Sequence, residues 1–499
     1  MSATTITVPE ITSVEQARGI VAHLFNELQQ AQWRVAQLEK QLYGPSSERQ
    51  TQESHLSKEQ VLFSLFPPPA EPPATQEVLV PAQEKAAPHP RRQPAIKVLE
   101  TVTERIEPQE KVCPHCGRTK CEIGYEKSER YEYIPARIIR HELIRPKLAC
   151  PCGKAGVSIA PMPPRVVARG QAAASLVAHV LLSKFVDHLP LYRQQQQFER
   201  LGVNFPKSTL GDWVEQGALW LQPIVREMKK QLLQSDYLQV DETPVRVQDP
   251  DVSGKCATGW LWVLGAPHND VIFEFHPGRG KEFAQQLLGG FKGYLQRDGY
   301  GVYGSLARDN LKLVPVGCWT HARRKFVDAL EDQSDEAMPL VNEVRRLYIV
   351  ERHARDECLG TEQRYQLRQQ LSLPILKGLQ PMLQSVQEKV LPQSPLGKAV
   401  RYCLGEWEAL KRYLLDGRLE IDNNLTENAI RPSAVGKKNW LFIGHPQAGW
   451  RSAVIYSIVV SCKRRGIEPW DYLRDVLTRL PDMKQSEISC LLPANWKPT

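Results

Sequence analysis

The sequence predicts a multidomain α/β protein, and three observations support this fold class. The chain has 499 residues, which is enough for several domains. Its hydrophobic fraction of 42% can bury large cores, and its middle part alternates strand-like and helical patterns. Lys and Arg outnumber acids 64 to 56, giving a net charge of +8. This excess permits a nucleic-acid partner but does not by itself indicate one.

The chain carries no pattern of a secreted or membrane protein. No N-terminal stretch joins positive charges to an apolar run, as a signal peptide would. The longest apolar run, at 452–462, is too short to cross a bilayer. We therefore expect a cytoplasmic protein with no membrane contact. In that reducing environment, clustered cysteines indicate a metal site rather than disulfides.

Residues 1–50 are expected to contain a leucine-zipper-like coiled-coil helix. Residues 13–43 contain no proline and a single glycine. Their apolar residues alternate steps of three and four, the heptad pattern of a helical seam. These residues are Val21, Leu24, Leu28, Ala31, Val35, Leu38 and Leu42. The pattern predicts a homo-oligomer formed through residues 13–43, although an amphipathic helix packing on its own domain would look the same. Residues 51–99 follow as a linker, with nine prolines between 66 and 97.

Residues 100–165 are predicted to form a zinc-ribbon module. Five of the eleven cysteines lie between 113 and 152. Cys113 and Cys116 form a C-x2-C pair, and Cys150 and Cys152 form a C-x-C pair. Four thiolates make a closed tetrahedral site for structural Zn²⁺, with no open position for catalysis. Because the second pair is shorter than usual, Cys121 or His115 could replace one ligand, and a metal-free ribbon is the alternative.

Residues 166–235 read as a helical, helix-turn-helix-like DNA-binding region. Helices are expected at 172–185 and 191–201, with a turn at 202–206 and a further helix capped by Ser208. Helix, short glycine turn and helix is the order of a DNA-reading motif. Ordinary helix packing produces the same pattern. The candidates for phosphate contact are Arg193, Arg200 and Lys207.

A different order of elements begins at Tyr237. Strands are expected at 238–247, 260–264 and 271–275, a helix at 281–288, and strands at 293–297 and 312–317 with a helix between them. This is the order of a ribonuclease-H-like fold, in which the first and fourth strands are neighbours. Asp241 on the first strand and Asp298 at the end of the fourth would then share one face. A buried carboxylate is costly unless it is paired or binds a cation.

Four ordered blocks now carry a family resemblance. They are residues 240–247 (Val-Asp-Glu-Thr-Pro-Val-Arg-Val), 297–303 (Arg-Asp-Gly-Tyr-Gly-Val-Tyr), 317–326 (Gly-Cys-Trp-Thr-His-Ala-Arg-Arg-Lys-Phe), and 422–433 (Asp-Asn-Asn-Leu-Thr-Glu-Asn-Ala-Ile-Arg-Pro-Ser) with 436–440. The chain resembles the insertion-sequence-66 family of bacterial DDE transposases. The resemblance extends to the zipper end at 42–48, the cysteine module, 187–193 and 469–475. It departs from the family at the C-x-C pair and at Lys437, where arginine is usual.

The resemblance implies a catalytic triad of Asp241, Asp298 and Glu427. These residues would hold two Mg²⁺ (or Mn²⁺) ions about 3.5–4 Å apart, with Asp241 shared between them. Water would free a 3′-OH at the element's end, and that 3′-OH would attack target DNA. Glu242, Asp309 and Asp422 are competing acids. Glu242 is expected to point away, since adjacent strand residues face opposite sides. The run 422–424 predicts a helix cap that places Glu427 on the first turn, facing inward.

The resulting organisation has a catalytic core at 236–318 and 419–465, an all-helical insertion at 319–418, and a C-terminal helix and tail at 466–499. Basic residues near the predicted active face are candidates for DNA contact, although such clusters are often merely solvated. They are Arg323, Arg324, Lys325, Lys437 and Lys438. Cys318 and His321 have near-metal spacing but no second pair, so we interpret them as structural or DNA-contacting.

The sequence therefore predicts a transposase that binds double-stranded DNA, both element ends and target, and catalyses cleavage and strand transfer. The resemblance also implies small accessory proteins of the same element. The alternative is a catalytically inactive or domesticated DNA-binding regulator. A ribonuclease-H-type or Holliday-junction nuclease is a third interpretation, disfavoured by the N-terminal modules and the long insertion.

Overall fold

The computed structural model describes residues 115, 118, 136–148, 158–168, 170–251 and 256–498. The predicted coiled coil, the proline-rich linker and the cysteines Cys113, Cys116, Cys150 and Cys152 lie outside these residues. The chain divides into two compact units, 1–136 and 137–499. Nearly all described residues belong to the second unit, which begins with a short antiparallel pair, β1 (Lys147–Leu148) and β2 (Ser158–Ile159).

Within the described residues, three helices precede the sheet: α3 (Ala174–Phe185), α4 (Leu191–Arg200) and α5 (Lys207–Leu232). The turn between α4 and α5 uses Gly202 at a φ of +84°, which glycine adopts without strain. Phe205 packs edge-on against Phe198 and Trp213, so the turn is fixed to both helices. The expected Ser208 cap is wrong, because α5 already begins at Lys207. Pro206, whose φ is fixed near the helical value, occupies the capping position instead.

The five-stranded sheet comprises β3 (Tyr237–Val247), β4 (Ala257–Gly265), β5 (Val271–His276), β6 (Gly293–Gln296) and β7 (Leu313–Val316). Its order is β5-β4-β3-β6-β7. β3, β4 and β5 pair antiparallel, whereas β6 and β7 run parallel to β3. The prediction that the first and fourth strands of this region are neighbours is therefore confirmed. Helices α6 (Lys281–Leu288) and α7 (Gly301–Asp309) connect β5, β6 and β7.

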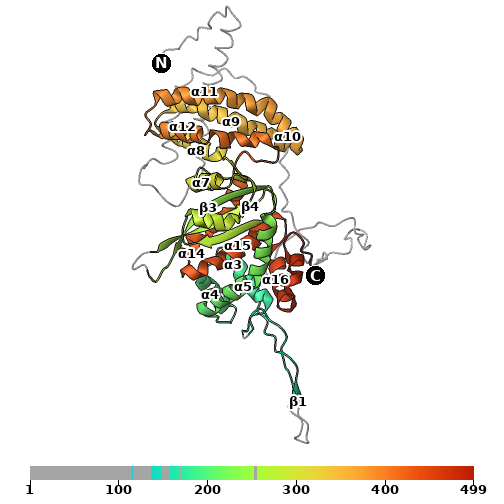
Figure 1. Ribbon diagram of the computed structural model, residues 1–499. Coiled ribbons are helices and arrows are strands. Elements are labelled where there is room, and N and C mark those ends of the chain that lie inside the picture. Colours follow the sequence, from blue (N-terminus) through green and yellow to red (C-terminus); the bar gives the residue numbers. More distant parts are fainter. Residues whose placement is uncertain are drawn as a thin grey trace, which may run out of the picture. The chain divides into compact units, whose positions relative to one another are not determined.

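A buried helix closes one edge of the sheet. α15 (Gly449–Arg464) lies against β5 and α5 (Figure 1). The Ser457 hydroxyl accepts a hydrogen bond from the Phe273 amide at 2.8 Å, and the Ser461 hydroxyl accepts one from the Val271 amide at 3.0 Å. These serines satisfy backbone groups that an edge strand would otherwise expose. The apolar run at 452–462 is thus an internal helix. In the described part of the chain, no helix is long and apolar enough to cross a membrane.

Residues 319–415 are helical and form the yellow-to-orange group in Figure 1. The helices are α8 (Trp319–Asp328), α9 (Ser334–Asp356), α10 (Thr361–Leu367), α11 (Leu373–Lys389), α12 (Pro395–Gly405) and α13 (Trp407–Lys411). A π-helical turn, Arg368–Ser372, joins α10 directly to α11. Ser394 caps α12, which begins with Pro395, and Glu406 separates α12 from α13.

The chain then returns to the sheet through α14 (Asn424–Trp440) and ends with α16 (Pro469–Arg479), which packs on α3. α14 contacts β3 and β4. This return brings residues beyond 420 back beside β3 and positions the candidate site.

Candidate active site

Asp241 lies in the middle of β3, opposite Val263 of β4. The Glu242 amide donates a hydrogen bond to Asp241 Oδ1 at 2.9 Å. Burial raises the pKa of Asp241 to about 8, and repulsion from Glu242, Asp298 and Glu427 adds to this rise. The carboxylates of Asp298 and Glu427 are thus near enough to act on Asp241.

The register of two parallel strands places Asp298 beside Asp241. Gln239 of β3 pairs with Gln296, the last residue of β6, and each acid follows its glutamine by two residues. The Tyr300 amide donates to Asp298 Oδ1 at 2.9 Å and orients the carboxylate. Gly299 allows this turn to pack under the Tyr402 ring, because a Cβ at Gly299 would lie 2.2 Å from Tyr402 Cε2.

Glu427 lies in the first turn of α14, as predicted. The N-terminus of this helix is tied to β3 by side chains. The side-chain amide of Asn423 donates to the Val240 carbonyl at 2.9 Å, and the Thr426 hydroxyl donates to Gln239 Oε1 at 3.1 Å. Gln239 Nε2 in turn donates to the Asp422 carbonyl at 3.2 Å. These bonds fix Glu427 beside the strand that carries Asp241.

A second glutamine extends this buried network to β6. Gln296 Nε2 donates to the carbonyls of Glu420 at 2.7 Å and Gly317 at 3.2 Å. The Glu420 amide donates to the Tyr237 hydroxyl at 3.0 Å. Gln239 and Gln296 are fully buried. Sequence reasoning did not identify them, although a glutamine within each of two neighbouring apolar strands was a visible signal.

The competing acids have partners of their own. Asp422 Oδ1 accepts from the Asn424 amide at 3.1 Å, and its Oδ2 accepts from the Thr320 hydroxyl, also at 3.1 Å. The expected cap is therefore only partly right: Asn423 occupies the capping position, but its side chain binds β3 rather than the helix. Asp309 pairs with Lys281 at the end of α7 and is half exposed.

Glu242 and Arg279 form a second charged centre that sequence reasoning missed. Arg279 Nε donates to Glu242 Oε1 at 2.7 Å, and the Tyr303 hydroxyl donates to Glu242 Oε2. The Arg279 guanidinium lies 3.7 Å from the centre of the Tyr300 ring and 4.0 Å from an Asp298 oxygen. Both oxygens of Glu242 are therefore engaged by donors. The prediction that Glu242 points away from a metal stays a prediction.

Glu427 is surrounded by residues of α8. His321 Nδ1 lies 3.7 Å from Glu427 Oε1, and Arg324 Nη2 lies 3.8 Å from Oε2. Cys318 completes a group of three potential metal ligands whose atoms lie within 4.8 Å of one another. Burial raises the pKa of the Cys318 thiol to about 12. Its sulfur accepts a hydrogen bond from the backbone amide of Asn423 at 3.3 Å, which suits a packing role for Cys318. The sequence had not linked Cys318 and His321 to Glu427.

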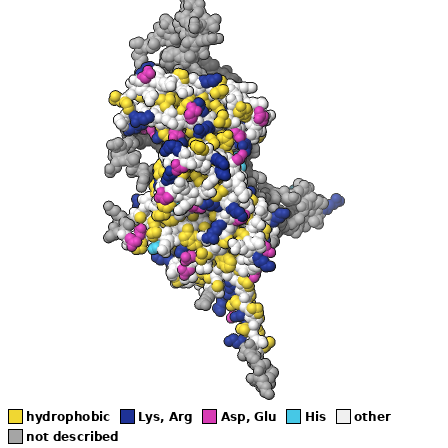
Figure 2. All heavy atoms as spheres, in the orientation of Figure 1, with side chains coloured by type: hydrophobic (Ala, Val, Ile, Leu, Met, Phe, Trp, Pro, Cys, Tyr) yellow, Lys and Arg dark blue, Asp and Glu magenta, His cyan; other side chains and the backbone are white. Residues whose placement is uncertain are grey.

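The predicted DNA-binding residues differ in whether their charged groups are exposed or hydrogen-bonded within the protein. Exposed side chains are those of Arg193, Arg200, Lys207, Arg323, Arg324, Lys325 and Lys438. Lys325 lies over the Tyr402 ring at 4.8 Å. Lys437 donates to Thr243 Oγ1 at 3.1 Å and to the Pro244 carbonyl at 3.0 Å, so it is bound to β3. On the face drawn in Figure 2, Lys and Arg side chains alternate with acidic ones rather than forming one continuous patch.

Comparisons with known proteins agree with this arrangement of modules. A family model described as "Transposase IS66 family" matches residues 169–451. The "IS66 C-terminal element" matches residues 457–494, and the "zinc-finger binding domain of transposase IS66" matches residues 110–153. These matches define a transposase with an N-terminal zinc-finger domain.

Similar proteins occur in Sinorhizobium fredii. The uncharacterized protein y4jD is 35% identical over 408 residues, which are 79% of each chain. The uncharacterized protein y4qI is 35% identical over 433 residues, 83% of this chain and 79% of the relative. This chain belongs to the IS66 family of transposases. Membership implies a function in transposition, and the transposase and zinc-finger domains imply binding of DNA and of zinc.

Proposed function

We propose that this chain is an active DDE transposase that cleaves and joins DNA at Asp241, Asp298 and Glu427. The observation that carries the proposal is the convergence of these acids around a half-buried carboxyl whose pKa is raised to about 8. The strand order β5-β4-β3-β6-β7, with β6 and β7 parallel to β3, supports a ribonuclease-H-like core. A carboxyl group with a raised pKa beside other acids is typical of catalytic sites.

The donor set fits divalent cations. Glu427 Oε1 is buried and has no hydrogen-bond partner among the described residues. Asp241 and Asp298 each receive a backbone amide on one oxygen. Carboxylate oxygens are the ligands that Mg²⁺ and Mn²⁺ prefer. When bound, two such ions would supply positive charge to the attacked phosphate and to the attacking and leaving oxygens. Asp241 would be the ligand shared between them.

The chain's own residues hold these acids in place. The amides of Glu242 and Tyr300 fix the orientation of Asp241 and Asp298, and the buried glutamines fix the start of α14. Arg324 is 58% exposed and lies beside Glu427, so its guanidinium can contact a DNA phosphate entering the site. His321 lies on the other side of that carboxylate, with its Nδ1 3.7 Å from Glu427 Oε1.

We propose the remaining modules as the sequence predicts them. They are a zipper helix at 1–50 for homo-oligomer formation, a linker at 51–99, a zinc module at 100–165, a helical DNA-binding region at 166–235, a core at 236–318 and 419–465, a helical insertion at 319–418, and a C-terminal part at 466–499. Metal analysis that finds less than one zinc per chain would contradict the site of Cys113, Cys116, Cys150 and Cys152. A chain lacking residues 1–45 that still forms the full oligomer would contradict the zipper.

The decisive experiment uses the purified chain, DNA ends taken from the flanks of its coding sequence, and Mg²⁺. Wild type should nick the ends and join them to target DNA. Asp241→Ala should lose both reactions while DNA binding changes little. Asp309→Ala is the matched control, because Asp309 is half exposed and pairs with Lys281. Cleavage that survives Asp241→Ala would refute the triad. Wild type that binds ends yet never nicks with Mg²⁺ or Mn²⁺ would favour the inactive regulator.

A further inference from the structure

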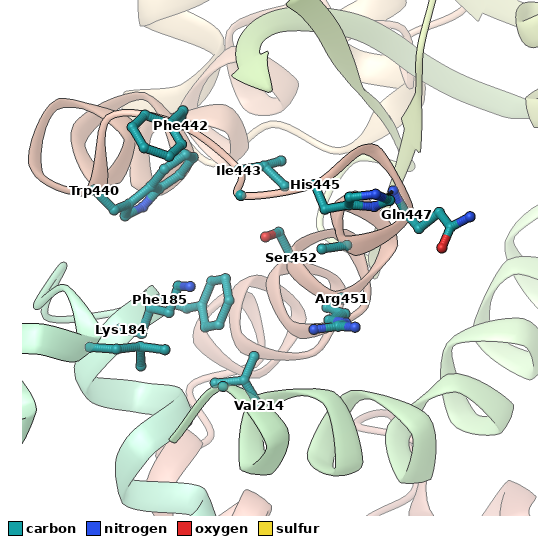
Figure 3. Close-up of a pocket in the computed structure, with 14 residues that line it drawn as sticks. Lys184, Phe185, Val214, Trp440, Phe442, Ile443, His445, Gln447, Arg451 and Ser452 are labelled. Atoms are coloured by element: carbon teal, nitrogen blue, oxygen red, sulfur yellow. Dashed lines mark hydrogen bonds between the residues drawn. The ribbon is translucent and has the colours of Figure 1, made fainter. Parts of the chain in front are cut away.

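A pocket of about 340 Å³ lies apart from the carboxylate site. One wall comes from α3 and α5, and the opposite wall comes from the end of α14, the following loop and the start of α15 (Figure 3). The residues used below are Lys184, Gly211, Trp440, Phe442, Gly444 and Arg451. Pockets of this size accept small organic ligands or single building units of a polymer.

The pocket carries an unbalanced positive charge. Arg451 Nη2 donates to Glu215 at 2.6 Å, so Glu215 neutralises that guanidinium. Arg451 Nε is buried without a hydrogen-bond partner in the described chain. Lys184 forms no ion pair with any acid among the described residues. Burial, and then repulsion from Arg451, lowers the pKa of Lys184 to about 8. A bound anion would offset the cost of burying the Lys184 ammonium, because it would pair with it. It would also screen Lys184 and Arg451 from each other.

Aromatic rings form the wall opposite Lys184. Trp440 is the last residue of α14, and Phe442 is 40% exposed two residues later. Figure 3 shows the two rings side by side at the pocket. Exposed aromatic faces beside cations are the combination that binds nucleotides, because the base stacks on the ring and the phosphate pairs with the cation.

Two glycines keep the pocket open. A Cβ added at Gly211 in α5 or at Gly444 in the loop would meet no atom within 4 Å, and neither residue has a positive φ. Gly211 is therefore required neither by packing nor by backbone conformation, although glycine weakens a helix. A larger side chain at this position would extend into the space that a ligand would use.

We propose that this pocket binds a single nucleotide, with its phosphate between Lys184 and Arg451 and its base against Trp440. The preferred source of this nucleotide is an unpaired position of the DNA substrate, so the inference rests on the proposed DNA reaction. A free nucleotide has the same chemistry. The pocket wall is joined to the site strand, because the Ile443 amide donates to the Arg246 carbonyl at 2.9 Å. Ile443 pairs with Val247, and Asp241 lies six residues before Val247, so the separation is roughly 20 Å along β3. A DNA strand could span both places, since this is about six steps of 3.4 Å.

The experiment uses the full, zinc-loaded chain with Ca²⁺ in place of Mg²⁺, so that binding is measured without cleavage. The probes are a duplex with one unpaired 2-aminopurine nucleotide, the fully paired duplex of the same sequence, and free dAMP. Wild type should bind the unpaired duplex about tenfold more tightly than the paired one, with 2-aminopurine fluorescence quenched by stacking. Gly211→Leu, which fills the pocket, should lose this preference and the quenching. Trp440→Ala should lose the quenching.

Matched variants separate pocket filling from damage to the fold. Gly211→Ala makes the same helix more regular but leaves the pocket open, so it should retain the preference. Lys184→Gln should weaken binding of the unpaired duplex about tenfold, whereas Lys484→Gln, an exposed lysine far along the chain, should not. Thermal melting should show Gly211→Leu to be at least as stable as wild type.

Each outcome is decisive. Equal affinity of wild type and Gly211→Leu for the unpaired duplex, with equal quenching, refutes the claim that the pocket binds an unpaired nucleotide of DNA. Binding of dAMP to wild type but not to Gly211→Leu would then assign the pocket to free nucleotides. No binding of either probe overturns the pocket altogether. A chain that shows the preference but never nicks DNA with Mg²⁺ contradicts the proposed catalysis and not the pocket.

Discussion

A buried ionic cluster in the helical segment should control the position of Glu427. Glu351 Oε1 accepts from Arg368 Nε at 2.7 Å, and its Oε2 accepts from Arg368 Nη2 at 2.9 Å and from Arg364 Nη2 at 2.7 Å. The side chains of Glu351 and Arg368 have no exposed surface. Arg368 also donates to the carbonyls of Tyr413, Asp416 and Leu419 at 2.7, 3.0 and 2.8 Å. The cluster therefore holds the chain that leads into α14.

The perturbation is Glu351→Gln, which keeps the shape of the side chain and removes its charge. Arg364 would keep its two bonds to Glu420, both at 2.9 Å, so its charge stays paired. Arg368 would keep only carbonyl partners and become a buried cation without a counter-charge. Breaking a buried pair in this way costs about 3–5 kcal/mol. Replacing both partners, as Glu351→Leu with Arg368→Met, should cost less than the sum of the single changes, by about 2 kcal/mol.

The assay is hydrogen–deuterium exchange of the full chain, read over residues 412–423, together with thermal melting. Glu351→Gln should speed amide exchange in that segment and lower nicking of DNA ends. The control is Glu343→Gln on the same helix. Glu343 pairs with Arg346, which is 56% exposed, so the change should cost less than about 1 kcal/mol. If Glu351→Gln exchanges and melts like Glu343→Gln, the cluster does not hold this segment and the reasoning fails.

Three further predictions concern the candidate site. Because the folded pKa of Asp241, about 8, exceeds its ordinary value of 3.8, the stability of the metal-free chain should fall as pH rises from about 4 to 8. Thermal melting should show this loss flattened in Asp241→Asn, and Mg²⁺ at pH 8 should raise the melting temperature of wild type alone. Gly299→Ala should shift the Asp298 turn away from Tyr402 and cost about 1–3 kcal/mol. The control Gly301→Ala, whose Cβ would meet no atom within 4 Å, should melt like wild type. In salt titrations of DNA affinity, Lys438→Gln should reduce the slope by about 1, and Lys437→Gln should change it less because β3 holds that ammonium.

The alternation of apolar and turn residues predicted most elements of the sheet. The helix expected at 281–288 coincides with α6, and the first strand begins one residue before the predicted start. Helix boundaries were harder to predict in the helical segment. There the π-helical turn at Arg368–Ser372 accompanies a buried arginine, and no local pattern of apolar residues encodes that tertiary contact.

The candidate site shows the same difference between what local sequence patterns predict and what tertiary contacts decide. Asp241 and Asp298 could be identified as unusual acids at strand positions, and the strand order made them neighbours. Glu427 was reached through the family resemblance. The residues that hold it were not identified, because a glutamine or an asparagine in a sequence does not reveal its distant partner. Gln239, Gln296 and Asn423 make hydrogen bonds across more than fifty residues of chain.

By itself, the sequence determined the composition of the modules, the strand and helix periodicities, and the acids available for metal chemistry. These follow from local patterns, since side-chain spacing decides which face of an element is apolar. Only the tertiary structure decided that Arg279 engages Glu242, that His321 and Arg324 flank Glu427, and that Lys184 and Trp440 line one pocket. The physical reason is that these contacts depend on how separate elements pack, and burial then sets the charge and pairing of each group.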